Sequence, residues 1–239
     1  MFRSLFCISF LLLFFCSCGN APTVIEHVPK SKTNKQAISK PTENFKKGLV
    51  YGLELKKSNR TPYEDAYGKA GDTVFICDYK GKMDMKDTLS QKRSFLFNLH
   101  AEFMVDRIYV IPLSGDRWFV SWQETDHEGV KSYAACFKTG APKPEWRLFF
   151  DVPNPGIPVL DNENVYVTYL GIAAKLSVDD GKFRWKHDSL FNTVKEPYKK
   201  FEKPRVFDNK VEFVDFPFPG HREKRDTLRV NPETGEVMK

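Results

Sequence analysis

The stretch Ala174-Lys-Leu-Ser-Val-Asp-Asp-Gly-Lys-Phe-Arg-Trp-Lys186 carries the pattern on which the fold prediction rests. Its first residues are typical of a strand, and a strand-like run, Asn164-Val-Tyr-Val167, precedes it. The pair Asp180-Gly181 suits a tight hairpin turn, because Gly adopts a positive φ freely. A further strand containing Trp185 follows the turn. We therefore predict a small antiparallel meander over this part of the chain.

The same pattern recurs at a fixed spacing. Pro112, Pro158 and Pro204 are 46 residues apart both times, and each precedes a turn with a carboxylate, at Asp116, Asp161 and Asp208. A strand-like run follows each turn, and further runs lie at 133–137, 173–178 and 227–230. A period of about 40–50 residues with several strands per unit is typical of a propeller-type array.

Each unit also carries a glycine turn, and two units carry a tryptophan after it. The glycines are Gly140, Gly181 and Gly235, and the tryptophans are Trp146 and Trp185. The second unit resembles the PQQ-like β-propeller repeat, in which a Trp four residues after a Gly turn docks against the next unit. Gly181 and Trp185 match that offset, whereas Trp146 follows Gly140 two residues too late. The resemblance spans residues 112–239; another β-meander protein with Gly turns is the alternative.

Strand-like runs upstream extend the array. They lie at 73–77, 94–99 and 107–111, with a further candidate at 49–55. We predict an all-β fold of antiparallel meander repeats of about 46 residues, in a small or partial β-propeller-like array of about four units. A closed ring and an open array both fit. We expect Trp185 to be buried against a neighbouring unit, together with either Trp118 or Trp122.

The first residues are typical of a bacterial lipoprotein signal. Arg3 precedes an apolar run at 5–15 that is too short to span a bilayer as a helix. Ser17 precedes Cys18, and a small residue before Cys is the pattern that lipoprotein signals share; bulky Phe15 makes Cys16 a poorer candidate. We predict a signal peptide at 1–17, a lipidated Cys18 (diacylglycerol and palmitate) with a flexible tether at 18–47, and the β domain at 48–239. An ordinary secretory signal is the alternative.

Composition bounds the possible functions. The 239 residues are 41% hydrophobic and 28% charged, which is too apolar for global disorder. The net charge of +6 comes from 37 basic and 31 acidic residues, an excess too modest to indicate nucleic-acid binding. The 14% aromatic content, mostly Phe, favours a β-rich core.

No motif for catalysis, metal or cofactor binding is found in the sequence. Cys77 and Cys136 lie in predicted strands, where we expect small buried hydrophobic residues, and whether they pair is left open. Asp126, His127 and Glu128 are neighbours in a predicted hairpin tip, and consecutive strand residues do not converge on a metal. The resemblance carries no quinone site, because the mature part lacks a pair of adjacent cysteines. We predict no cofactor and no enzymatic activity.

Four short segments match an Asp-Ser/Thr-aliphatic pattern, similar to the acceptor of some bacterial periplasmic O-glycosylation systems. The alternative is a turn followed by the start of a strand, since Asp favours turns and Thr with Val or Leu favours strands. The candidate acceptors are Thr73, Thr88, Ser189 and Thr227.

The leading functional hypothesis is a non-enzymatic interaction or scaffold module, lipid-anchored in the bacterial cell envelope. We expect an outer-membrane anchor facing the periplasm, with surface exposure as the alternative. The expected partners are the membrane, through the lipid, and another envelope protein, but not nucleic acid. A small-ligand-binding protein or enzyme with a site at the axis of the array is one alternative. A lipoprotein that neutralises a toxin is another.

Overall fold

The computed structural model describes residues 45–58, 63–190, 200–216 and 226–239. They all belong to one unit of the chain, Glu43–Lys239. Secondary structure in these ranges consists of β-strands without any α-helix. Within the same ranges, no helix is long and apolar enough to cross a membrane.

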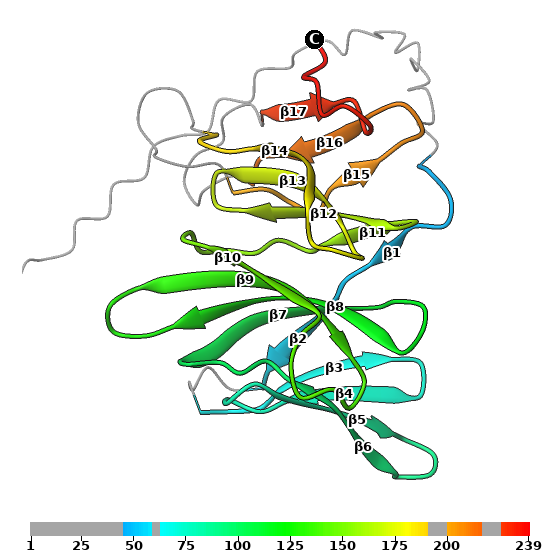
Figure 1. Ribbon diagram of the computed structural model, residues 1–239, viewed down its shortest axis with the longest axis vertical. Coiled ribbons are helices and arrows are strands. Elements are labelled where there is room, and N and C mark those ends of the chain that lie inside the picture. Colours follow the sequence, from blue (N-terminus) through cyan, green and yellow to red (C-terminus); the bar gives the residue numbers. More distant parts are fainter. Residues whose placement is uncertain (1–44, 59–62, 191–199, 217–225) are drawn as a thin grey trace, which may run out of the picture. The chain divides into compact units, whose positions relative to one another are not determined.

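Four antiparallel meanders follow one another along the chain, and we call them the first to fourth units (Figure 1). The first unit contains β3 (Ala66–Ala70), β4 (Thr73–Cys77), β5 (Lys82–Asp87) and β6 (Arg93–Asn98). The second contains β7 (Met104–Pro112), β8 (Arg117–Thr125), β9 (Val130–Lys138) and β10 (Trp146–Phe150). The third contains β11 (Val159–Asp161), β12 (Asn164–Tyr169), β13 (Ile172–Ser177) and β14 (Phe183–His187).

The fourth unit contains β15 (Arg205–Val206), β16 (Val211–Val214) and β17 (Thr227–Val230), and Val237 adds an isolated bridge to Val230. This architecture confirms the predicted all-β fold of antiparallel meanders in about four units. Among the described strands, no pairing joins the first unit to the fourth.

One segment, residues 45–57, contacts all four units, and we call it the strap. It starts at the fourth unit, where Phe45 stacks on Phe207 with 5.0 Å between ring centroids. Its strand β1 (Val50–Tyr51) pairs with β11 of the third unit, and β2 (Leu53–Lys57) pairs with both β7 and β3. The strap therefore joins the first strands of three units by backbone pairing, and β2 merges the first two units into one nine-stranded sheet.

A glycine lets the strap pass between two sheets. Gly52 separates β1 from β2, although residues 49–55 form a single strand-like run in the sequence. A Cβ at this position would lie 2.7 Å from the Pro158 ring, so only Gly allows this close approach. Phe45 and Lys46, which the sequence analysis assigns to the tether, also contact the folded unit, because Lys46 N donates to Val206 O at 3.1 Å.

Apolar side chains fill the space between neighbouring units. Between the first and second units, Phe97 stacks on Phe137 with centroids 4.5 Å apart, beside the fully buried Trp122. Between the second and third, Phe150 stacks on Tyr169 at 3.9 Å. The expectation that Trp118 or Trp122 is buried is confirmed for Trp122.

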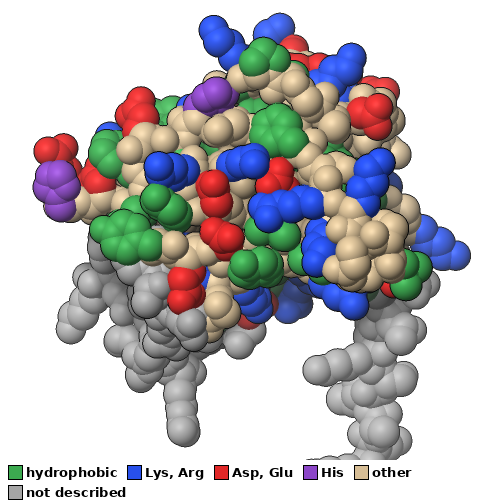
Figure 2. Space-filling view, turned by 90° about the horizontal axis from the view of Figure 1, so that it is seen from below, with side chains coloured by type: hydrophobic (Ala, Val, Ile, Leu, Met, Phe, Trp, Pro, Cys, Tyr) green, Lys and Arg blue, Asp and Glu red, His purple; other side chains and the backbone are tan. Residues whose placement is uncertain are grey.

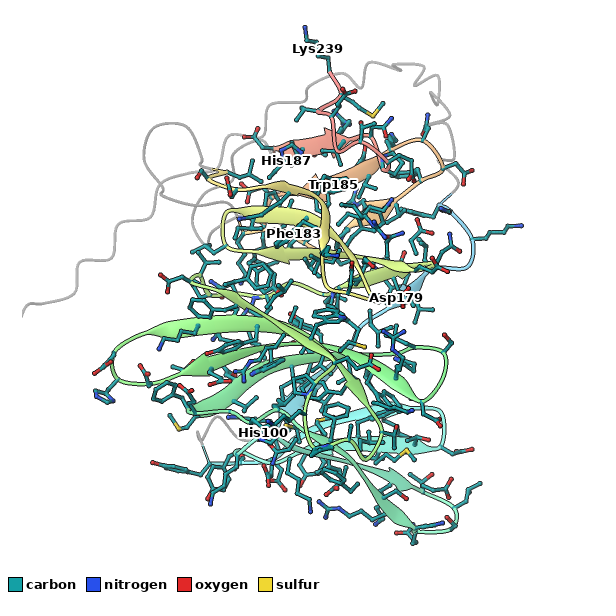
Figure 3. All side chains as sticks on the ribbon, in the orientation of Figure 1. His100, Asp179, Phe183, Trp185, His187 and Lys239 are labelled. Atoms are coloured by element: carbon teal, nitrogen blue, oxygen red, sulfur yellow. The ribbon has the colours of Figure 1, made fainter. Side chains whose placement is uncertain are left out.

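Two tryptophans dock on the glycine turn of the following unit. A Cβ on Gly181 would lie 2.7 Å from the Trp146 ring, and a Cβ on Gly235 would lie 2.5 Å from Trp185. Both glycines have a positive φ, 68° and 74°. Trp185 is 8% exposed, which confirms its predicted burial; Figure 3 labels it on β14, next to the fourth unit.

Hydrogen bonds fix the two docked indoles in the same way. Trp146 Nε1 donates to Val178 O at 2.9 Å, and Trp185 Nε1 donates to Pro232 O at 3.1 Å. Each acceptor lies three residues before the glycine of its turn. Trp146 therefore docks like Trp185 although it follows Gly140 two residues late in the sequence.

A cation of the same unit reinforces each dock. Arg117 donates to Val178 O and pairs with Asp179, while Lys175 donates to Pro232 O at 2.8 Å and pairs with Glu233. The hydrogen bonds of Arg117 to Asp179 hold its pKa above the usual range. In each turn, one backbone carbonyl accepts two hydrogen bonds from the preceding unit, one from the indole and one from the cation. The carboxylate of the next residue pairs with that cation. We call this arrangement of carbonyl and carboxylate the socket.

Replacing Trp185 by Ala is expected to lower the free energy of unfolding by about 3–5 kcal/mol, because truncating a buried Trp leaves a cavity. Thermal and denaturant unfolding measure this change. Lys182→Ala, an exposed substitution in the adjacent turn, is the control and should leave the midpoint nearly unchanged. A Trp185→Ala midpoint within a degree or two of wild type would show that Trp185 does not hold the units together.

Candidate functional site

The candidate lipidation site, Cys18, lies outside the described residues. Of the repeat residues, Trp146, Gly181, Trp185 and Gly235 meet in the two docks. Gly140 does not take part in a dock, because nothing lies within 4 Å of a Cβ built there. Its N–H instead donates to Leu96 O of the first unit at 2.6 Å.

The four candidate O-glycosylation residues occupy turns and strand starts. Thr73 and Thr227 are the first residues of β4 and β17, as the alternative interpretation expects. Thr88 lies in the turn after β5, and Ser189 is exposed beyond the end of β14. Glycosylation of these residues stays a prediction.

Both described cysteines are free and buried. Burial raises the pKa of the Cys77 thiol well above its usual value and raises the pKa of Cys136 to about 11. Cys136 Sγ lies 3.4 Å from a carboxylate oxygen of Glu145, which disfavours the thiolate further. Both residues are small buried side chains of the core, as the sequence predicts.

The acidic cluster at 126–128 is the tip of the β8–β9 hairpin, as predicted. Asp126 Oδ1 accepts hydrogen bonds from the N–H groups of Glu128 and Gly129, both at 2.7 Å, and so closes the turn. His127 points into solvent. Across the described ranges, no group of three or more His, Cys, Asp or Glu side chains is arranged to hold a metal.

A buried carboxylate that the sequence analysis missed lies beside this hairpin. Glu124 accepts a bond from Trp122 Nε1 at 2.9 Å, from Arg147 at 3.3 Å and from the backbone N–H of Glu102 at 3.1 Å. The guanidinium of Arg147 also lies 4.1 Å from the centre of the Tyr133 ring. With several donors on it, this carboxylate fixes the end of the second unit and offers no free group for catalysis.

The outer edges of the first three units share one feature. Strands β6, β10 and β14 each pair with the rest of their sheet on one side only. Each carries an exposed phenylalanine: Phe95, Phe149 and Phe183. In the described part of the chain, no other segment forms a backbone hydrogen bond with β10 or β14 on the open side, whereas Gly140 N reaches Leu96 O on β6.

The first unit has a sheet face that no other unit covers, and we call it the outer face. Cross-strand pairing places Tyr67, Ile76, Asp84 and Phe95 in one row of this face and Lys69, Val74, Lys86 and Arg93 in the next. Lys82 lies on the same side, because it precedes Asp84 by two residues on β5. Figure 2 views the domain from this end and shows Lys and Arg side chains among carboxylates and apolar groups.

A buried carboxylate holds the centre of each end of the array. On the outer face, Asp84 accepts from Arg93 at 2.6 Å and lies 3.6 Å from Lys82. On the fourth unit, Glu212 accepts from Arg229 at 2.9 Å and from Lys210 at 3.1 Å. The third strands of the inner units instead place fully buried alanines at the interfaces: Ala134, Ala135, Ala173 and Ala174. Polar outer faces of this kind are typical of terminal repeats.

The glycine turn of the first unit is altered. Gln91 stands where the other turns have Gly181 and Gly235. In all three turns, the N–H four residues before this position donates to the carbonyl of the residue after it, at 2.9–3.0 Å. Gln91 has a positive φ of 58°. Its side-chain amide donates to Thr88 O at 2.6 Å, the carbonyl equivalent to the two that accept docked indoles. The side chain of Gln91 thus takes the acceptor that a docked indole uses in the other two turns.

The chain matches no protein-family model and no curated protein. Among solved structures, it is similar to BamB from Moraxella catarrhalis, with 14% sequence identity and a TM-score of 0.38. The match covers 64% of this chain and 40% of that chain. At this level the likeness is weak, and the function has to be argued from this chain's own residues.

Proposed function

We propose that this protein is a lipid-anchored, non-enzymatic interaction module of the bacterial cell envelope. The support from the sequence is the lipoprotein-type signal that ends at Cys18. The support from the structure is the pair of open edge strands, β10 and β14, on a domain whose second, third and fourth units are joined by docked tryptophans.

The observation that carries the proposal is the pair of open edges on β10 and β14. An edge strand presents unpaired N–H and C=O groups, which another extended segment can pair with. Phe149 and Phe183 lie on these strands and are 54% and 40% exposed. The ring of Phe183 packs edge-on against Phe150 of the neighbouring unit, with 6.2 Å between ring centroids. A segment of an envelope protein added here would gain backbone bonds from the edge and apolar contact from the rings.

The strap argues against a ligand site at the axis of the array. It pairs with β3, β7 and β11, the first strands of three units, and so covers the edges that face such an axis. The strap does not pair with β10 or β14, so it leaves these outer edges accessible to a partner.

Replacing Cys18 by Ser is expected to release the protein from membranes into the soluble fraction, because acyl chains are what hold it there. Fractionation and incorporation of radiolabelled acyl chains measure the change. A Cys16→Ser variant is the control and should remain membrane-bound. Labelling that persists in the Cys18→Ser variant would move the acceptor to another residue or exclude lipidation.

A photoreactive phenylalanine analogue at position 149 or 183 is expected to crosslink to another protein in living cells, because a strand added to β10 or β14 would lie against these side chains. Gel shifts of the tagged protein measure the adducts. The control is the analogue at His127, whose side chain is 89% exposed at the tip of the β8–β9 hairpin and lies off both edges. Adducts at His127 alone, or none at either edge, would contradict the proposal.

A further inference from the structure

The outer face of the first unit is not built for a second copy of this chain. Both tryptophan docks of this protein use a glycine turn with a free carbonyl, and in the first unit Gln91 occupies both the position and the acceptor, Thr88 O. The first unit therefore offers no socket to the tryptophan of another copy, and its outer face is left for a different occupant.

The charges of the outer face select an anionic occupant. This face holds four cations and two carboxylates: Asp84, which is shared by Arg93 and Lys82, and Asp78, which lies opposite Lys82 at the end of the β4–β5 hairpin. Lys69 and Lys86, on β3 and β5, form no ion pair with any described residue. Since they flank Val74 in one cross-strand row, they lie about 10 Å apart, two strand spacings.

Exposed apolar side chains lie on and around this face. Tyr67 and Phe95, at the two ends of the other row, are each 44% exposed. Leu89, in the turn that follows β5, is 79% exposed, and Tyr63, in the loop that precedes β3, is 70% exposed. Within the described residues these two are the most exposed large hydrophobic side chains. They project from opposite ends of the first unit, which follows from their places before β3 and after β5.

We propose that the outer face of the first unit binds the headgroup surface of an anionic phospholipid membrane. Lysines complement the phosphates, and tyrosine, phenylalanine and leucine side chains suit the boundary between headgroups and acyl chains. A broad sheet face with separate apolar tips contacts an extended planar surface at several points. An acidic peptide would gain its backbone hydrogen bonds at a strand edge, whereas this face presents only side chains.

The inference deepens the proposed function, because a lipid at Cys18 would keep the domain close to a membrane. The predicted tether of about 28 residues joins the domain at the fourth unit, at the opposite end of the array from the outer face (Figure 1), and a chain of this length can extend to roughly 90 Å and so reach past the array. At that range the membrane has a high effective concentration, so a weak face is enough to orient the domain. With the first unit on the membrane, the open edges of β10 and β14 remain available to a protein partner.

The experiment measures co-sedimentation with vesicles, using the chain from residue 18 to residue 239 with Cys18→Ser, so that acyl chains play no part. Vesicles of phosphatidylcholine alone are compared with vesicles that also contain phosphatidylglycerol, at low and at physiological salt. The face variant is Lys69→Gln with Lys86→Gln. The control variant is Lys138→Gln with Lys143→Gln, which removes the same charge from exposed positions at the end of β9 and in the following loop of the second unit.

The expected result is salt-sensitive binding to the anionic vesicles, weakened roughly thirty-fold in the face variant and less than about threefold in the control, as two lysines at an anionic surface imply. Leu89→Ser is expected to weaken binding that remains at physiological salt. Thermal unfolding of each variant checks that all are folded.

Equal weakening in both double variants, or equal binding to neutral and anionic vesicles, would overturn the inference. Binding to poly-glutamate without binding to vesicles would also overturn it and would favour an acidic protein partner. Since the chain tested has no lipid, a failure of Cys18 anchoring or of edge crosslinking leaves this result unaffected.

Discussion

The structure depends on the docking of an indole on a glycine turn. A meander of four short strands has two faces and cannot bury both by itself, so each unit needs its neighbours. Trp146 and Trp185 supply a large buried contact together with a directed hydrogen bond to the backbone of the next unit. The glycine is required twice over, because its φ is positive and because a Cβ would overlap the ring. Packing and backbone conformation are thus linked at one residue.

The same constraint explains how the array ends. A repeat that lacks a neighbour needs another donor for the carbonyl that an indole would bind, and it needs a polar outer face. In the first unit, Gln91 donates to that carbonyl, Thr88 O. The ion pair of Asp84 with Arg93 makes the outer face polar. With the first unit closed in this way, its outer face and the edges of β10 and β14 are left open in the described part of the chain. The proposed functions follow from these surfaces, and chemistry at buried side chains such as Glu124 plays no part in them.

Local pattern was sufficient to predict the units and the burial of Trp185, because strand runs, glycine turns and a Trp at a fixed offset lie close together in sequence. The strap was missed because its partners, from β3 to Val206, are spread over the whole chain. A single strand-like run at 49–55 also hides the break at Gly52. The first unit did not show the repeat, since Gln91 replaces the glycine that marks it. The outer face could not be foreseen either, because cross-strand neighbours such as Lys69 and Lys86 meet only once the register is known.

The central claim is that Trp185 and the turn at Gly235 act as one interlocking contact, and a double-mutant cycle tests it most directly. Unfolding free energies would be measured for Trp185→Ala, Gly235→Ala and the double variant. If the indole packs on Gly235, removing the indole also removes its overlap with the Cβ of Gly235→Ala. The double variant should then be more stable than the sum of the two single effects predicts, by about 1 kcal/mol or more. Additive effects, within about 0.3 kcal/mol, would contradict the account.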